Sequence, residues 1–156
     1  MRSIARACLP VLAFSLLAPV CAQAASPRFT NVLPHGGQRG TEVDVVLYGS
    51  NLQDAEEVLL YDSGMEVVSL THPEADDQKP RSVNVRFRIA ADCRLGAQRM
   101  RIRTRTGLSD LQSFHVGALP VVEEVEPNTD FEQPQVITNN TTVHGRVDNE
   151  DVDYYV

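Results

Sequence analysis

The fold is decided by Ser82-Val-Asn-Val-Arg-Phe-Arg-Ile89, in which apolar and polar side chains alternate without a break. Because successive side chains of a strand point to opposite faces, this pattern predicts a strand with one buried and one exposed face. Residues 98–105 repeat the pattern, with Met100 and Ile102 facing inward and arginines facing outward. Residues 42–48 alternate in the same way, so the period alone predicts three half-buried strands.

Shorter apolar segments lie between these strands, separated by glycine, proline and polar turn residues. The further predicted strands are residues 29–33, 58–61, 65–70 and 112–116. A tight, Gly-rich turn is expected over Pro34–Gly37, and residues 71–80 are expected to form an exposed loop. About seven short strands in about 90 residues, without a convincing helical pattern, predict an all-β fold: an immunoglobulin-like antiparallel β-sandwich over residues 27–117.

Residues 1–24 have the organisation of a secretory signal peptide. Arg2 and Arg6 provide a positively charged start, residues 7–20 are mostly apolar, and Ala22-Gln-Ala24 fits a small-residue cleavage pattern that places the cut before Ala25. The apolar stretch of about 14 residues is short for a membrane span of about 20. We therefore expect an exported protein without a transmembrane span, located outside the cell, at its surface or in the periplasm.

Removal of the signal peptide changes both charge and cysteine content. The remaining chain has 12 basic and 21 acidic side chains, a formal net charge of −9. Such a charge repels nucleic acid, so no nucleic-acid partner is expected. Cys93 is the single cysteine left, and since a disulfide framework needs an even set, the domain is expected to be stabilised by its apolar core.

A second segment follows the hinge Gly117–Pro120, with a predicted linker over residues 118–122. Residues 121–156 hold nine acidic side chains and one basic side chain. These 36 residues are too few for a second closed sandwich. Residues 123–156 are therefore predicted to be an incomplete second β-domain, either poorly packed in isolation or lying along the first. Because the sequence stops within an alternating apolar run, we expect this chain to be the front part of a longer protein.

Motifs in the first part resemble the opening of IPT/TIG domains, which are immunoglobulin-like modules. The stretches PHGGQRGT (residues 34–41) and VVLYGSNL (residues 45–52) fit the family pattern of Pro, Gly, Gly-Thr, Val and Gly-x-Asn-Leu. Residues 95–117 look like the version found in large exported proteins of planctomycete-type bacteria. The resemblance covers residues 27–117 and implies the sandwich fold.

The second part resembles the start of a bacterial pre-peptidase C-terminal (PPC) domain. The matching stretches are Glu124-Val-Glu-Pro-Asn128, Val143-His-Gly145 and Asp151-Val-Asp-Tyr-Tyr155. They make residues 123–156 the N-terminal fragment of a PPC-like β-domain. That family is a β-sandwich often attached to secreted peptidases, so the resemblance implies an accessory module.

The acidic residues of this fragment are a candidate calcium site. Carboxylate, amide and carbonyl oxygens are the ligands that calcium prefers, six to eight of them. Some PPC-like collagen-binding modules place calcium at this position, and the corresponding residues here are Glu124, Glu126, Asn128, Glu150 and Asp153. The alternative is a solvated acidic linker without any ion.

Six arginines stand on the outward faces of the two clearest strands: Arg86, Arg88, Arg99, Arg101, Arg103 and Arg105. If residues 82–89 and 98–105 pair as a hairpin, all six share one sheet surface, where like charges repel. Three partners are considered: Glu42 and Asp44 from a neighbouring strand, the acidic segment beyond residue 120 docked on this face, or an anionic glycan.

No nucleophile elbow or phosphate-binding loop is present, and the four histidines lack metal-ligand spacing, so we predict no catalytic residues and no enzyme. The leading hypothesis is a non-catalytic, exported spacer or adhesion module of a larger secreted or cell-surface protein. Its partners are then downstream domains of the same chain and an extracellular protein or glycan. The alternative is the N-terminal accessory region of a secreted peptidase. A transcription factor, suggested by the IPT/TIG fold, is disfavoured by the export signal and the negative charge.

Overall fold

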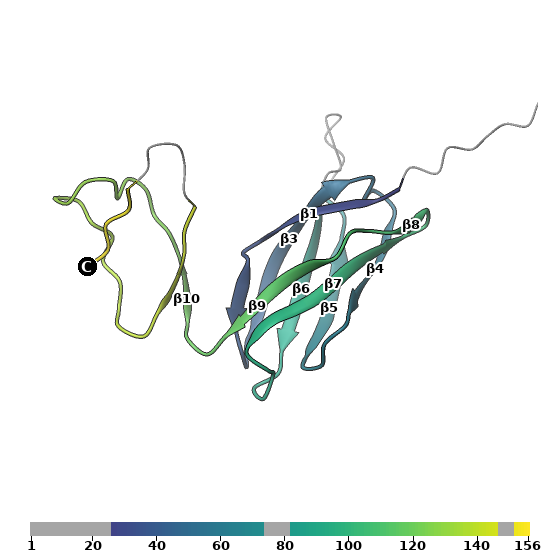
Figure 1. Cartoon of the computed structure of the whole chain (residues 1–156), viewed down its shortest axis with the longest axis horizontal. Helices are drawn as coiled ribbons and strands as arrows, with labels where there is room; N and C mark the ends of the chain where they lie inside the picture. Colours follow the sequence, from purple (N-terminus) through teal and green to yellow (C-terminus); the bar gives the residue numbers. More distant parts are fainter. Residues whose placement is uncertain (1–25, 74–81, 147–151) are drawn as a thin grey trace, which may run out of the picture.

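The computed structural model describes residues 26–73, 82–146 and 152–156. These residues form eleven strands and no helix, and the first nine strands build two sheets that pack face to face (Figure 1). The all-β, immunoglobulin-like sandwich predicted from the sequence is confirmed. None of the described residues belongs to a helix that is long and apolar enough to cross a membrane.

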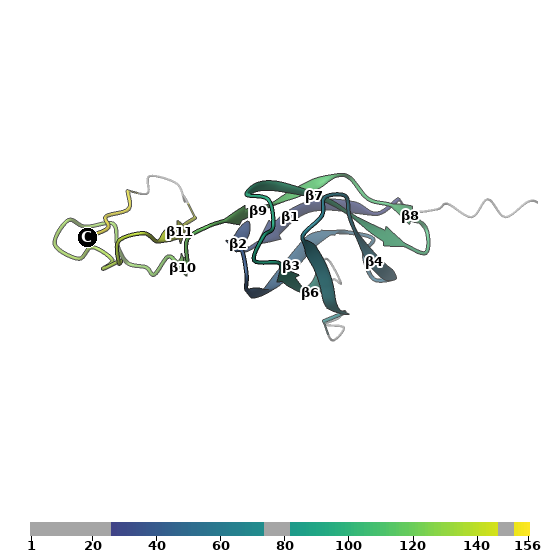
Figure 2. The same ribbon diagram turned by 90° about the horizontal axis from the view of Figure 1, so that it is seen from below.

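Each sheet has a simple strand order. The first sheet is antiparallel in the order β1 (Arg28–Leu33), β3 (Glu42–Ser50), β6 (Ser82–Ile89), β5 (Met65–Thr71). The second has the order β2 (Gly36–Gln38), β9 (Gln112–Gly117), β7 (Gly96–Thr104), β4 (Ala55–Leu60), with β8 (Gly107–Leu108) added on β7. Figure 2 shows the two layers edge-on.

The core lies between the two sheets, and β6 contributes every second residue to it. The buried side chains of this strand are Val83, Val85, Phe87 and Ile89. Met100 and Ile102 face them from β7, as the alternation predicted. Phe87 meets Phe114 of β9 edge to face, with ring centroids 5.7 Å apart. This arrangement of aromatic rings is favourable beyond the area it buries.

The expected turn over Pro34–Gly37 is wrong in part, because Gly36–Gln38 is a strand. After β1 the chain passes from the first sheet to the second and pairs in parallel with β9. Glycine permits this pairing: a Cβ atom at Gly36 would lie 2.4 Å from the carbonyl oxygen of His115. A composition rich in glycine marks a turn in most sequences, but here it marks a close approach of two backbones.

The Gly49-Ser-Asn-Leu52 motif closes the other end of β3. A Cβ atom at Gly49 would lie 1.9 Å from the carbonyl oxygen of Arg28, so only glycine fits beside β1. Asn51 has φ of 58°, a left-handed conformation that asparagine tolerates, and its Nδ2 donates to the carbonyl oxygen of Ser26 at 3.0 Å. Leu52 is fully buried in the core.

The C-terminal unit, of which residues 121–146 and 152–156 are described, extends beyond the end of the sandwich at which β9 leaves it (Figures 1 and 2). Its strands β10 (Val121–Glu123) and β11 (Thr142–His144) pair in parallel, and Gln135 forms an isolated bridge with Tyr155. Val121 and Val122, part of the sequence-predicted linker, thus already belong to a strand. Asn128 is the buried residue among those described in this unit, whereas Phe131 is 78% exposed.

The inter-sheet contact of Phe87 makes a first prediction. Phe87→Ala removes a fully buried ring and leaves a cavity, so the free energy of unfolding should fall by about 3–5 kcal/mol. Urea denaturation of the two proteins measures this difference. Leu111→Ala, at an exposed position before β9, serves as the control and should change stability by less than about 0.5 kcal/mol. Equal effects of both substitutions would contradict this account of the core.

Candidate functional site

The six arginines do not share one surface. The predicted hairpin of residues 82–89 and 98–105 is wrong, since β6 and β7 lie in different sheets. Both edges of β6 are already occupied, one by β3 and the other by β5, so β7 has no free edge of β6 with which to pair. Arg86 and Arg88 therefore stand on one outer face of the sandwich, and the arginines of β7 stand on the opposite outer face.

Acidic residues of neighbouring strands pair with the arginines of the first sheet. Arg86 donates two hydrogen bonds to the carboxylate of Asp44, from Nε to Oδ1 at 2.7 Å and from Nη2 to Oδ2 at 2.6 Å. Arg88 contacts Glu42 at 2.8 Å and also pairs with Glu66 of β5. The predicted ion pairs with Glu42 and Asp44 are confirmed. Such exposed ion pairs contribute little to stability individually. They nevertheless provide an acidic partner for both arginines of β6, so this face needs no further anion to balance them.

The second sheet has its own ion pairs. Arg99 binds Asp62 at 3.1 Å, and Arg103 binds Glu57 at 2.9 Å and also Glu56. Nη1 of Arg101 donates to the carbonyl oxygen of Ser109 at 2.9 Å, and the backbone N–H of Arg105 donates to the backbone carbonyl oxygen of Asp54 at 3.4 Å. These partners come from the sandwich and not from the acidic C-terminal unit. An anionic glycan on either face stays a prediction.

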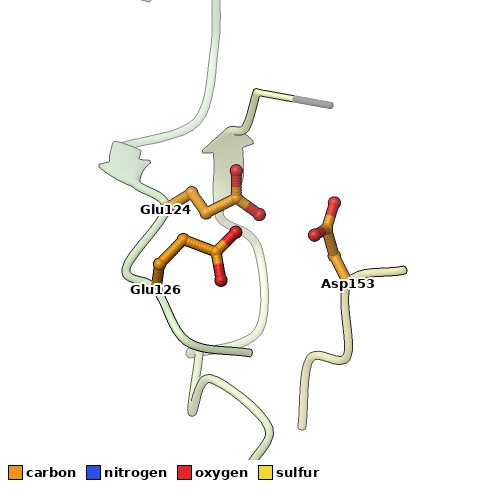
Figure 3. A group of neighbouring side chains, drawn as sticks. All are labelled: Glu124, Glu126 and Asp153. Carbon is orange, nitrogen blue, oxygen red and sulfur yellow. The ribbon is translucent and has the colours of Figure 1, made fainter. Parts of the chain in front are cut away.

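Three carboxylates converge in the C-terminal unit. Glu124 and Glu126 lie just after β10, Asp153 lies near the C-terminus, and Figure 3 shows the three groups turned toward one another. One oxygen of each lies within 4.8 Å of the others. We call these residues, together with Asn128, the acidic cluster. Glu150, the fifth residue of the predicted calcium site, lies outside the described residues.

Asn128 is the centre of the acidic cluster and is fully buried. Its Nδ2 donates to Oε1 of Glu124 at 3.1 Å, and its backbone N–H donates to Oε2 of Glu126 at 2.9 Å. Its Oδ1 is buried and has no hydrogen-bond partner among the described residues. A buried amide oxygen without a donor is unfavourable, so this atom is suited to a cation.

Glu124 is held ionised by its neighbours. The Tyr155 hydroxyl donates to Oε1 at 2.5 Å, and the backbone N–H of Arg146 donates to Oε2 at 2.7 Å. Together with the Asn128 amide, these donors lower the pKa of Glu124 from 4.5 to about 2. The same contact raises the pKa of the Tyr155 hydroxyl to about 12. The acidic cluster therefore keeps a permanent negative charge near neutral pH.

A second group of polar residues joins the sandwich to the C-terminal unit. His35, between β1 and β2, meets His144 of β11, with Nδ1 of His35 3.0 Å from Nε2 of His144. We call these two residues the histidine pair. A cleft of about 510 Å³ opens beside it, lined on one side by Asp44 and on the other by residues of the acidic cluster.

Sequence reasoning placed the acidic cluster, and it missed the histidine pair. Glu124, Glu126, Asn128 and Asp153 were included through the PPC resemblance. His35 and His144 are 109 residues apart and share no motif, so no local signal connects them. Tyr155 was noted only as part of a family pattern, because a hydroxyl donor to Glu124 carries no sequence signature.

Comparison with known proteins leaves the chain without an assigned family. No family model matches it, and no curated protein matches it. Among solved structures, it is similar to a Bacteroides ovatus protein, SGBP-B of the mixed-linkage glucan utilization locus, solved in complex with a mixed-linkage heptasaccharide. The identity is 21% and the TM-score 0.41, and the match covers 64% of this chain and 24% of that one. A likeness this distant carries no argument about function.

The Asp62–Arg99 pair predicts a pH dependence. Hydrogen bonds from Arg99 lower the pKa of Asp62 from 3.8 to about 2. A carboxyl group whose pKa is lower in the folded protein than in the unfolded chain stabilises the fold at pH values above its unfolded pKa. This contribution is lost as the pH falls through the pKa of the folded protein. Wild type should therefore unfold at a higher temperature than Asp62→Asn above about pH 4, and the difference should vanish toward pH 2.

Melting temperatures of both proteins between pH 2 and 7 provide the measurement. Asp92→Asn is the control for removing one negative charge from a neighbouring exposed loop. A difference between wild type and Asp62→Asn that stayed constant down to pH 2 would rule out the ionised Asp62 as its cause.

Proposed function

We propose that this chain is a non-catalytic spacer module of a larger exported protein, in which an IPT/TIG-like sandwich carries a PPC-like unit. The observation that supports this best is the path of the chain. The described chain enters the sandwich at the β8 end and leaves from β9 at the opposite end, toward β10 (Figure 1). A domain with entry and exit at opposite ends adds its full length to the distance between its neighbours.

The residues behind the IPT/TIG resemblance have structural roles that favour it. Gly36 and Gly49 lie where any side chain would collide with a neighbouring backbone, and Leu52 fills the core. Gly40 has φ of 80°, which glycine adopts readily. The motif is therefore explained by backbone geometry that this sandwich needs, as expected for a family built on one fold.

The surface favours a structural role for most charged residues. Arginines on both outer faces pair with acids of adjacent strands, as Arg86 does with Asp44 and Arg103 with Glu57, and buried apolar side chains fill the space between the sheets. The partners we propose are the downstream domains of the same protein, with an extracellular protein or glycan as the target of an adhesive role.

Calcium is the cofactor we propose for the acidic cluster. Glu124, Glu126 and Asp153 provide carboxylates, and the buried Oδ1 of Asn128 supplies a neutral oxygen that lacks a donor. This donor set consists entirely of oxygen, which calcium prefers and which zinc and copper do not. When bound, the ion would neutralise three converging carboxylates and connect the segment after β10 to the C-terminal residues.

Calcium titration tests this cofactor. Adding CaCl2 to the full chain should raise the melting temperature of the C-terminal unit, because a ligand that binds only the folded state stabilises it. Glu126→Gln and Asp153→Asn should each abolish most of that increase. Glu132→Gln, which changes an exposed acid outside the acidic cluster, is the matched control and should keep it. An increase of the same size in all four proteins would refute a site at these residues.

The spacer role is tested by the distance between its ends. Cysteines introduced at Leu108 and Val136, both exposed, can carry spin labels in a Cys93→Ala background. Pulsed electron paramagnetic resonance then measures the distance between the two labels. A spacer that holds its two parts at a set separation predicts one narrow distance distribution in the presence of calcium. A broad distribution with and without calcium would contradict it, and this outcome is separate from whether calcium binds.

A further inference from the structure

The histidine pair lies where the sandwich meets the C-terminal unit, and each ring is fixed by an oxygen on its far side. Nε2 of His35 is 3.0 Å from Oδ1 of Asn31, and Nδ1 of His144 is 2.8 Å from Oε2 of Glu123. The near nitrogens, Nδ1 of His35 and Nε2 of His144, are 3.0 Å apart. Both rings therefore make a polar contact at each nitrogen.

The two far contacts decide which nitrogens carry protons. Oδ1 of Asn31 also accepts the backbone N–H of Val32 at 2.9 Å, so this atom is the amide oxygen and an acceptor. A carboxylate oxygen of Glu123 is an acceptor as well. His35 must therefore donate from Nε2 and His144 from Nδ1. In neutral rings, this leaves two unprotonated nitrogens facing each other.

No distribution of two protons satisfies all three contacts. If His35 carries its proton on Nδ1 to reach His144, its bare Nε2 faces the amide oxygen of Asn31. If His144 carries its proton on Nε2, its bare Nδ1 faces the carboxylate of Glu123. The backbone N–H of His35 donates to Nε2 of His144 at 3.3 Å, a long hydrogen bond that a bound ion would replace, and the lone pair on Nδ1 of His35 is left unmatched. A third proton shared between the rings, or a metal ion in its place, would complete all three contacts.

We propose that the histidine pair binds a divalent transition-metal ion of the zinc and copper class, through Nδ1 of His35 and Nε2 of His144. Metal–nitrogen bonds of about 2.0–2.1 Å place two adjacent ligands about 2.9–3.4 Å apart, for angles between square and tetrahedral. The observed separation of 3.0 Å falls in this range. The rings are inclined at 62°, so they are not stacked against each other.

The surroundings suit a dication. The adjacent cleft of about 510 Å³ has room for the water molecules that complete the coordination of a site with two protein ligands. Glu123, Glu124 and Glu126 line it against one arginine, Arg146, whereas the charge of Asp44 is already paired with Arg86. The excess negative charge raises the local concentration of cations.

Asn31 and Glu123 orient the ligands, as carboxylates and carbonyl oxygens do for metal-binding histidines generally. One orienting residue and one ligand come from the sandwich, and the other two come from the C-terminal unit. A bound ion would therefore tie the two parts together across the junction. This site uses nitrogen ligands and is separate from the oxygen-rich acidic cluster, so it stands whether or not calcium binds.

Isothermal titration of ZnCl2 into the full chain, with calcium present in excess, tests the proposal. We expect one ion per chain, and a loss of affinity of at least about tenfold in His35→Gln and in His144→Gln. His115→Gln, which removes an exposed histidine of β9, is the control and should bind as wild type does. Asp153→Asn should keep zinc binding even where it abolishes the calcium response.

Copper identifies the ligands directly. The electron paramagnetic resonance spectrum of the Cu²⁺ complex should show hyperfine splitting from two imidazole nitrogens in wild type. In either histidine variant it should show splitting from one. Zinc binding that is unchanged in both variants, or a copper spectrum without imidazole nitrogen, would overturn the proposal. So would no detectable zinc binding in a wild type that is folded, as its far-ultraviolet circular dichroism reports.

Discussion

The closure of two apolar sheet faces on each other is the constraint on which the rest of this structure depends. Phe87 from one sheet and Phe114 from the other meet at its centre, and side chains from β3, β6 and β7 surround them. Burial of apolar surface drives this packing, and the entropy of ordering a small domain opposes it. With a single buried cysteine and no disulfide among the described residues, stability rests on that contact.

Sheet closure also decides what the charged residues do. Each strand that turns its apolar side chains inward must turn its polar ones outward, so β6 and β7 present arginines on opposite outer faces. There, each row meets acidic residues of its neighbouring strands. A feature that looked in the sequence like one concentrated basic surface becomes two separate ladders of ion pairs, since the strands belong to different layers.

The junction between the sandwich and the C-terminal unit gathers residues from distant parts of the chain. The switch of β1 into β2 places His35 at the end of the sandwich, and the parallel pairing of β10 with β11 brings His144 and Glu123 to it. The acidic cluster lies on the same unit. The candidate cation site built on nitrogen thus lies where the two parts meet, and the candidate site rich in oxygen lies within the C-terminal unit.

Much of the fold and part of the site were predictable from local pattern. The period-two alternation of residues 82–89 correctly predicted a strand and which of its side chains are buried and which exposed. It could do so because the direction of a side chain in a strand depends only on its position along the strand. The convergence of Glu124, Glu126 and Asn128 was expected from the PPC resemblance, and strand geometry does not explain it, because these residues lie after β10 and outside any strand. Strand pairing did not follow: β6 and β7 are adjacent in sequence but lie in separate sheets. The histidine pair also required the tertiary structure, because contacts between residues 109 apart arise only when the whole chain has packed.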